Sequence, residues 1–179
     1  MDNNFNILIA GFGGQGVLFA GKVLAYCGLL DEKHISWLPS YGPEMRGGTA
    51  NCSVCISNTP VGSPLVLNPN VFVAMNTPSF DKFINDVDPG AYVFIDSSLI
   101  IRKVERDDLK VFYVPATKLA LENNLKGLAN MIILGKMFSE LKFCSYETLS
   151  SAIKKCIPPK KSHLLEFNTK AIDLGINLN

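Results

Sequence analysis

Six residues near the amino terminus, GFGGQG at 11–16, have the types and spacing of a loop that can hold a phosphate group. They follow a short apolar run at 5–10 and precede a stretch whose apolar residues recur at helical spacing. The first N–H groups of a helix have no partners within it, and that end carries partial positive charge, so it suits an anion. Gly11 and Gly13 allow a tight turn and close approach of a ligand, because they have no Cβ atom.

The other residues of this loop have expected roles of their own. Gln15 is predicted in the first helical turn, where its polar amide is a natural ligand contact. Gly16, one turn into the helix, would let the helix pack closely on the preceding strand. A tight turn that binds nothing is the alternative, because the Gly-x-Gly-x-x-Gly pattern alone has low specificity.

The same glycine pattern is typical of nicotinamide and flavin dinucleotide sites, which need one further residue. Such sites have an acidic side chain at the end of the second strand, about 20 residues further on, that binds the ribose hydroxyls. Asp31 and Glu32 lie at about that distance, but they precede the predicted second strand, and Pro39 and Ser40 stand at its end. A stand-alone NAD(P)- or flavin-dependent reductase therefore remains only an alternative hypothesis.

A second candidate group is YGPEMRGG at 41–48, in which a proline and two glycines restrict the loop. Arg46 is its only cation. In an α/β sheet, a loop after the second strand lies at the carboxyl edge, beside the first glycine loop. Arg46 could then offer a bidentate fork to a phosphate or a carboxylate. An exposed Arg46, or one paired with Glu44, is equally compatible with the spacing.

No arrangement of residues indicates self-sufficient catalysis. Cys52 and Cys55 are three apart in a predicted strand, so they point to opposite faces and are expected as buried or half-buried thiols. His34 and His163 lack ligand spacing, and no Ser/His/Asp or paired-carboxylate arrangement is present. The turn at 96–98 ends a strand and suits either a ligand contact or a plain turn. The sequence therefore favours binding, and no metal site is expected.

The composition predicts one compact cytoplasmic domain over residues 1–179. The chain is 47% hydrophobic and 18% charged, and its net charge of +1 gives no case for nucleic acid or anionic lipid. The start has no secretory pattern, and no apolar run approaches the roughly 18 residues of a membrane span. Five cysteines, an odd number, fit free thiols in a reducing cytosol.

The elements that must position these residues alternate between strand and helix in the first two-thirds of the chain. This order predicts a Rossmann-like, mostly parallel α/β sheet flanked by helices, with a helical C-terminal third. Thr77 is the expected cap of a short helix, with Pro78 at its first position. Strands are predicted at 5–10, 34–38, 49–57, 71–75, 91–96 and 110–114. Other helices are predicted at 14–30, 116–125, 127–142, 145–156 and from about 160 to 175.

Several stretches, taken together and in order, resemble one known family. They are GFGGQGV with GKVLA behind it, SYGPEMRGG, VPATKLALE, NMIILG at 130–135 and EFNTKAIDLG at 166–175. This combination is similar to the gamma subunit, or gamma domain, of the 2-oxoacid:ferredoxin oxidoreductases, and it covers nearly the whole chain. These enzymes act on pyruvate, 2-oxoglutarate, ketoisovalerate and other branched-chain oxoacids, or indolepyruvate.

The resemblance implies a subunit of a larger enzyme. Alpha and beta subunits would form the thiamine diphosphate site, and iron–sulfur clusters on partner subunits, including a ferredoxin-like delta subunit where one exists, would pass electrons to ferredoxin. The oxoacid is decarboxylated and its acyl group passes to coenzyme A. The family's gamma domain is associated with coenzyme A binding, so coenzyme A is the implied ligand of this chain. A non-catalytic scaffold is the further alternative, and 2-oxoglutarate is the first substrate expected, before pyruvate or ketoisovalerate.

Carried onto this sequence, the resemblance implies three groups of binding residues. The nucleotide end of coenzyme A would lie against Gly11, Gly13, Gly14, Gln15 and Gly16. Its phosphates, or a neighbouring subunit, would contact Arg46, Gly47 and Gly48. Weaker candidates are Asn76 and Thr77 at a strand end and Asn130 on a helix. Asn70 is a departure, because many relatives carry Asp before this strand.

Overall fold

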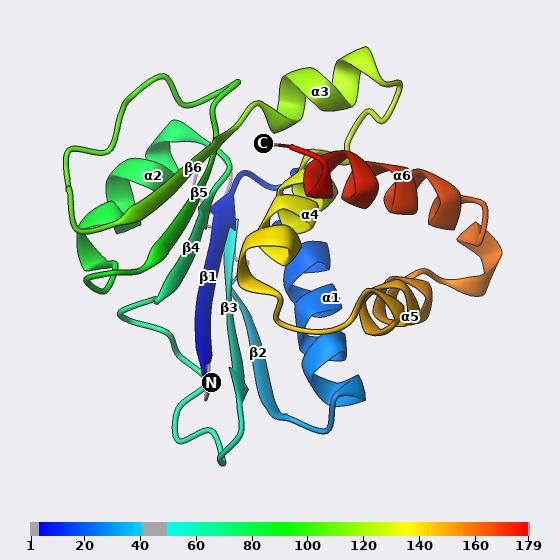
Figure 1. Cartoon of the computed structure of the whole chain (residues 1–179), viewed down its shortest axis with the longest axis horizontal. Helices are drawn as coiled ribbons and strands as arrows, with labels where there is room; N and C mark the ends of the chain where they lie inside the picture. The colour runs from blue at the N-terminus through cyan, green and yellow to red at the C-terminus, as the bar shows by residue number, and fades with distance from the viewer. Residues whose placement is uncertain (1–3, 41–49, 179) are drawn as a thin grey trace.

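The computed structural model describes residues 4–40 and 50–178 and contains one six-stranded sheet with the order β2-β3-β1-β4-β5-β6 (Figure 1). The strands correspond to the apolar runs of the sequence, within a residue or two at their ends. They are β1 (Phe5–Gly11), β2 (His34–Ser40), β3 (Ala50–Ser57), β4 (Val71–Ala74), β5 (Tyr92–Asp96) and β6 (Lys110–Val114).

The sheet is mixed, although five of its six strands run in one direction. β1 pairs in parallel with β4, β4 with β5, and β5 with β6. β3 lies between β1 and β2 and is antiparallel to both. The prediction of a mostly parallel α/β sheet is confirmed in strand direction, and the single reversed strand is the difference. The carboxyl ends of the other five strands therefore share one edge of the sheet.

β2 continues further than the sequence predicts. Pro39 was expected to stop this strand, yet Pro39 pairs with Cys52 and the strand ends at Ser40. β2 is an edge strand, so one row of its backbone groups has no strand partner. A proline, which lacks an N–H, is tolerated in such a position.

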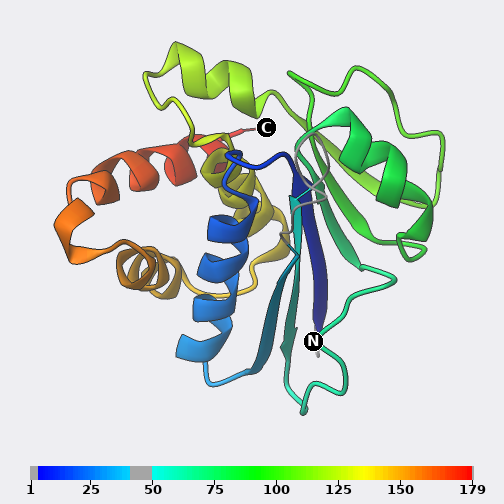
Figure 2. The ribbon, with the colours of Figure 1, turned by 180° about the vertical axis from the view of Figure 1, so that it is seen from behind.

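Helices cover the two faces of the sheet unequally (Figures 1 and 2). Four helices, α1, α4, α5 and α6, lie on one face, and the short α2 lies on the other, against β1 and β4. Each side has its own apolar cluster, centred on residues such as Ile9 and Met131 on the first face and Phe72 and Phe80 on the second. The helices are α1 (Val17–Leu30), α2 (Thr77–Phe83), α3 (Ala116–Glu122), α4 (Ala129–Leu141), α5 (Tyr146–Cys156) and α6 (Leu164–Ile176), with 3₁₀ turns η2 (Ile84–Asp86) and η3 (Pro159–Lys161).

Helices α4 and α6 meet backbone to backbone through two glycines. A Cβ atom at Gly135 would lie 2.1 Å from the carbonyl oxygen of Ile172, and one at Gly175 would lie 2.0 Å from that of Ile132. These distances leave no room for any side chain, so both positions need glycine. The close contact fixes α4, whose first turn faces the glycine loop.

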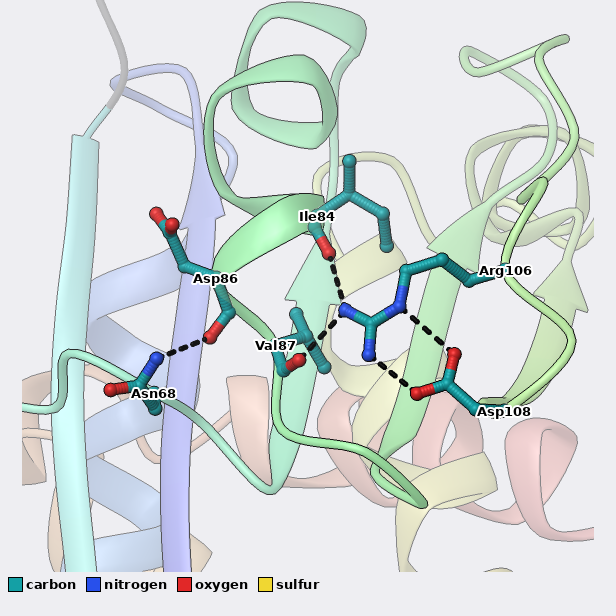
Figure 3. Close-up of polar contacts among 6 residues, drawn as sticks. All are labelled: Asn68, Ile84, Asp86, Val87, Arg106 and Asp108. Carbon is teal, nitrogen blue, oxygen red and sulfur yellow. Dashed lines mark hydrogen bonds and ion pairs between the residues drawn. The ribbon is translucent and has the colours of Figure 1, made fainter.

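Arg106 connects the segment between β5 and β6 to the turn that follows α2 through hydrogen bonds (Figure 3). Its Nε and Nη2 atoms donate to the two carboxylate oxygens of Asp108, at 3.0 and 2.6 Å. Its Nη1 atom donates to the carbonyl oxygens of Ile84 and Val87, at 3.3 and 2.7 Å. The hydrogen bond from Arg106 holds the pKa of the Asp108 carboxyl below its usual range. This contact stabilises the half of the sheet that lies away from the glycine loop.

The five cysteines are free thiols. Cys52 and Cys55 are both buried and point to opposite faces of β3, as the strand geometry predicts. The Cys52 thiol faces α1, where it contacts the carbonyl oxygen of Val17, and the Cys55 thiol contacts that of Ser63. Within residues 4–40 and 50–178, no helix is long and apolar enough to cross a membrane.

Candidate functional site

The glycine loop joins the carboxyl end of β1 to α1 through two left-handed residues. Gly14 has a φ of +94° and Gly16 has a φ of +75°, conformations that side chains other than glycine rarely adopt. The helix begins only at Val17, with Gly16 as its N-cap. The prediction that Gln15 and Gly16 lie inside the first turn is therefore wrong, because the two left-handed residues hold the chain out of the helix until residue 17.

The side chain of Gln15 turns inward and holds the loop. Its Oε1 accepts a hydrogen bond from the backbone N–H of Phe12 at 2.6 Å, and its Nε2 donates to the carbonyl oxygen of Met75 at 2.8 Å. Gly11 makes room for this amide, since a Cβ there would lie 2.7 Å from the Gln15 Oε1. The amide predicted to contact ligand is thus bonded within the chain, and it ties the loop after β1 to the end of β4.

Asn76 and Thr77 follow β4 after one residue, near the strand end where the sequence expects them, but their side chains bond within the fold. Asn76, not Thr77, caps α2, because its Oδ1 accepts from the backbone N–H of Ser79 at 2.8 Å. The Asn76 amide nitrogen also donates to the Gln15 Oε1 at 3.4 Å. The Thr77 hydroxyl donates to the carbonyl oxygen of Leu99 at 3.3 Å.

Asn130, in the first turn of α4, lies against the other side of the loop. Its Nδ2 donates to the carbonyl oxygen of Gly16 at 3.0 Å. A Cβ atom at Gly16 would lie 2.5 Å from that same nitrogen, so both the φ angle and the contact require glycine. The Asn130 Oδ1 is buried and has no hydrogen-bond partner among the described residues. Asn130 therefore holds Gly16 in place from a helix 114 residues further along the chain.

The glycine loop and Asn76 lie between the ends of β1 and β4, where successive connections of the chain turn to opposite sides of the sheet. The chain leaves β1 through α1 toward β2 on one side, and leaves β4 through α2 toward β5 on the other. Ligands of open α/β sheets bind at such a switch point, outside the carboxyl ends of the strands. The glycine loop and the residues after β4 lie side by side here, and their binding of a ligand stays a prediction.

A cavity of about 290 Å³ opens beside the loop. Its lining residues are Phe12, Gly13, Gly14, Gly16, Val17, Leu18 and Ala50. Gly16, Val17 and Leu18 place the start of α1 at this cavity. No described side chain caps the helix and its first turn has no acidic residue, so no described group offsets the positive potential of that end. Sequence reasoning missed Phe12, although an aromatic residue inside a glycine loop, here 40% exposed, is a usable signal.

Asp31 and Glu32 lie at the opposite end of α1 from the cavity. Asp31 is the C-cap of that helix and accepts a hydrogen bond from the hydroxyl of Thr148 at 2.9 Å. A helix of 14 residues separates them from the loop by about 20 Å. They therefore cannot bind a ribose held at the glycine loop.

Two other sequence predictions concern the same edge of the sheet. Arg46, Gly47 and Gly48 lie outside the described residues, and their role stays a prediction; the residues that border their segment, Ser40 and Ala50, both lie at the carboxyl edge. Asp96, the last residue of β5, is fully buried, and its carboxylate accepts from the backbone N–H of Ser98 and from the hydroxyl of Thr117, so it supports a turn. No cluster of metal-ligating side chains occurs in the described parts of the chain.

Comparison with known proteins decides the family. Residues 6–178 match the family model described as pyruvate ferredoxin/flavodoxin oxidoreductase. The chain belongs to this family. It is 38% identical over 170 residues to the ketoisovalerate oxidoreductase subunit VorA of Methanothermobacter thermautotrophicus, a match that covers 94% of this chain and 35% of that protein. The chain thus spans about a third of the length of that relative.

Other members of the family match the chain along most of their own length. The 2-oxoglutarate synthase subunit KorC of Methanocaldococcus jannaschii is 33% identical over 167 residues, which cover 90% of this chain and 89% of that one. The crystal structure of a keto/oxoacid ferredoxin oxidoreductase gamma subunit from Geobacter sulfurreducens superposes with a TM-score of 0.81 at 27% identity, covering 96% of this chain and 95% of that one. The sheet and helices described above are therefore the fold of this family.

Proposed function

We propose that this chain is the gamma component of a 2-oxoacid:ferredoxin oxidoreductase and that its glycine loop binds the phosphates of coenzyme A. Family membership over residues 6–178 supports the first part. The similarity to KorC along nine-tenths of the chain also supports it. The uncapped start of α1, which faces the cavity beside Gly13 and Gly14, is the observation that carries the second part.

The cavity has the chemistry that a phosphate ligand needs. Backbone N–H groups at a helix start donate hydrogen bonds to phosphate oxygens, and the helix dipole stabilises their charge. A volume of about 290 Å³ is below that of most drug-sized sites, so it suits the phosphate part of a larger molecule. Phe12 at the rim offers an aromatic face to the rest of the ligand. The side chains of Gln15, Asn76 and Asn130 would act by holding the loop, because their amides bond within the chain.

In this proposal the chain works with partner subunits in the cytoplasm. Alpha and beta subunits hold thiamine diphosphate, iron–sulfur clusters lie on partners that include a ferredoxin-like delta subunit, and ferredoxin accepts the electrons. The complex decarboxylates a 2-oxoacid oxidatively and transfers the acyl group to coenzyme A. The substrates to test are 2-oxoglutarate first, then ketoisovalerate and pyruvate, because relatives of all three types match this chain.

Co-expression tests the subunit assignment. The chain is produced with the alpha and beta subunits encoded in the same genome, and reduction of methyl viologen is measured with each oxoacid, with and without coenzyme A. Co-purification and coenzyme A-dependent reduction support the proposal. Failure of the chain to co-purify with any such partner overturns the assignment.

Calorimetric titration of the full chain with coenzyme A and with NADH tests the loop. Gly14→Ala places a methyl group at the cavity, where it meets no protein atom within 4 Å, and should weaken coenzyme A binding by about tenfold or more. Gly90→Ala is the matched control, because Gly90 also has a positive φ and open space but lies at the opposite edge of the sheet. Equal coenzyme A affinity in both variants contradicts the site, and binding of NADH in place of coenzyme A favours the stand-alone reductase.

A further inference from the structure

The end of α5 and the turn that follows it carry a concentrated positive charge. The stretch 148–165 contains no aspartate or glutamate but has four lysines, Lys154, Lys155, Lys160 and Lys161. The first two lie in the last turn of α5, and the other two lie in the 3₁₀ turn η3. We refer to these four residues as the lysine cluster. It is a local feature, because the net charge of the whole chain is only +1.

The side chains of the lysine cluster have no partner within the described part of the chain. All four residues are exposed, and their ammonium groups form no hydrogen bond, ion pair or cation–π contact with a described residue. By contrast, Lys136 and Lys170 each pair with a glutamate four residues away. Figures 1 and 2 show α5 and its connection to α6 at the outer rim of the helical layer, on the side away from the sheet. The cluster is therefore free to contact another molecule.

The stability of α5 accounts for only half of the cluster. Lysines in the last turn of a helix face the negative end of its dipole, so Lys154 and Lys155 stabilise α5. Lys160 and Lys161 lie beyond that helix in a single 3₁₀ turn, where no described acidic side chain pairs with them. Like charges this close together repel one another and lower the stability of the folded chain. An anionic partner would remove this repulsion on binding.

The residue types of this surface favour a protein that binds only transiently. Lysine is depleted in stable protein interfaces, whereas the contacts of electron-carrier proteins are small and depend on opposite charge. Leu164 and Phe167, at the start of α6, are 36% and 41% exposed and add a small apolar area next to η3. Arginine, which binds phosphate groups through its two-pronged fork, is absent from 148–165, so nucleic acid fits this surface less well.

We propose that the lysine cluster is a docking surface for the acidic face of the ferredoxin that accepts electrons from the complex. This inference rests on the proposed function, in which ferredoxin is the acceptor. Opposite charges steer the encounter, and a contact made by exposed charges stays weak enough for the reduced carrier to leave. The lysines only bind the carrier. A reduced iron–sulfur cluster on a partner subunit loses one electron, and the bound ferredoxin gains it.

The experiment compares two electron acceptors on the co-expressed complex. Oxoacid- and coenzyme A-dependent reduction is measured with the ferredoxin of the same genome and with methyl viologen, a small dication that needs no basic docking surface. The double variants Lys154→Glu/Lys155→Glu and Lys160→Glu/Lys161→Glu should each raise the KM for ferredoxin by about fivefold or more at low salt. The rise should shrink at about 300 mM salt, because salt screens exposed charges. The rate with methyl viologen should not change.

Lys82→Glu with Lys103→Glu is the matched control, because it makes the same change of charge at two exposed lysines on α2 and in the connection after β5. A KM for ferredoxin that stays within about twofold in both cluster variants overturns the docking surface, and so does an equal rise in the control. Loss of co-purification or of methyl viologen reduction in the cluster variants would mean that the lysines hold a subunit, which also overturns it. An unmodified complex that reduces methyl viologen with none of the three oxoacids overturns the proposed function, and the docking surface with it.

Discussion

Replacing Gln15 with glutamate tests whether this side chain holds the glycine loop, because the two side chains have nearly the same shape. The Gln15 Nε2 donates to the carbonyl oxygen of Met75 at 2.8 Å, and Met75 is 1% exposed. An ionised carboxylate has no hydrogen to donate, so the variant turns this hydrogen bond into a contact between two oxygens. The acceptor bond from the N–H of Phe12 is retained. The change therefore removes one interaction and leaves the rest of the loop contacts in place.

A buried acceptor left without its donor costs about 1–3 kcal/mol. For a chain of this length, 1 kcal/mol corresponds to a shift in Tm of about 2–4 °C, so Gln15→Glu should lower the Tm by roughly 2–12 °C at pH 7.5. A protonated carboxyl can again donate to Met75, so the fold favours the protonated form and raises the pKa of the new side chain. The stabilisation from the protonated carboxyl of the variant is fully present below its unfolded pKa of about 4.3, and it is lost as the pH rises through its folded pKa. The difference in Tm between the variant and the unmodified chain should therefore be smaller at pH 5.0 than at pH 7.5.

The assay is thermal unfolding of the variant and the unmodified chain at pH 7.5 and pH 5.0, followed by circular dichroism. Asn85→Asp is the matched control, because it makes the same amide-to-acid change at an exposed position in η2. A Tm within 1 °C of the unmodified chain at both pH values would show that Gln15 does not hold the loop. A deficit that grows as the pH falls would refute the assignment of Nε2 as the donor.

Three further substitutions test the contacts around this site and away from it. Asn130→Asp removes the donor to Gly16 and places a charge where a buried oxygen has no described partner. The free energy of unfolding in urea should therefore fall by about 2 kcal/mol or more. An unchanged urea midpoint would contradict this role of Asn130. Gly135→Ala should lower the free energy of unfolding by about 1–3 kcal/mol in the same assay, because its Cβ would lie 2.1 Å from a carbonyl oxygen of α6. This clash should exceed the roughly 1 kcal/mol by which alanine favours a helix over glycine. A gain in stability would mean that α4 and α6 can move apart without cost. Asp108→Asn should lower the stability of the chain at pH 7, because a carboxylate paired with Arg106 contributes only while it is ionised. The difference in stability between the variant and the unmodified chain should vanish as the pH falls below about 4 and through the lowered pKa of Asp108. A stability difference that does not change with pH would contradict the pairing.

The sequence predicted the elements well because each has a local cause. The apolar run before Gly11 and the helical spacing after Gly16 are visible over a few residues, and so is the turn between α2 and β5. The direction of β3 was not predictable in this way, because pairing between β1 and β3 depends on contacts across the sheet. The start of α1 was also misplaced, since the left-handed conformations of Gly14 and Gly16 become apparent only in the structure.

The sequence predicted which segments lie side by side at the candidate site better than it predicted what their side chains bind. That the loop after β1 lies beside Asn76 follows from general rules for parallel sheets. That Gln15 faces inward, and that Asn130 binds Gly16 from the far half of the chain, depends on tertiary contacts that no local pattern encodes. A polar residue in a loop looks the same in sequence whether it binds a ligand or another part of the backbone.

This division of roles explains why the glycine pattern alone could not name a ligand. With the amide nitrogens of Gln15 and Asn130 engaged in the fold, the proposed ligand contacts are the backbone N–H groups at the start of α1. Such groups select for negative charge and hydrogen-bond acceptors rather than for one molecule. Selectivity must come from the surroundings of the phosphate. Asp31 and Glu32, the acids that could have bound a ribose, lie at the far end of α1, and the described rim is formed by Phe12, Leu18 and Ala50. These surroundings favour a phosphate ligand that does not depend on an acidic ribose contact, as the coenzyme A proposal requires.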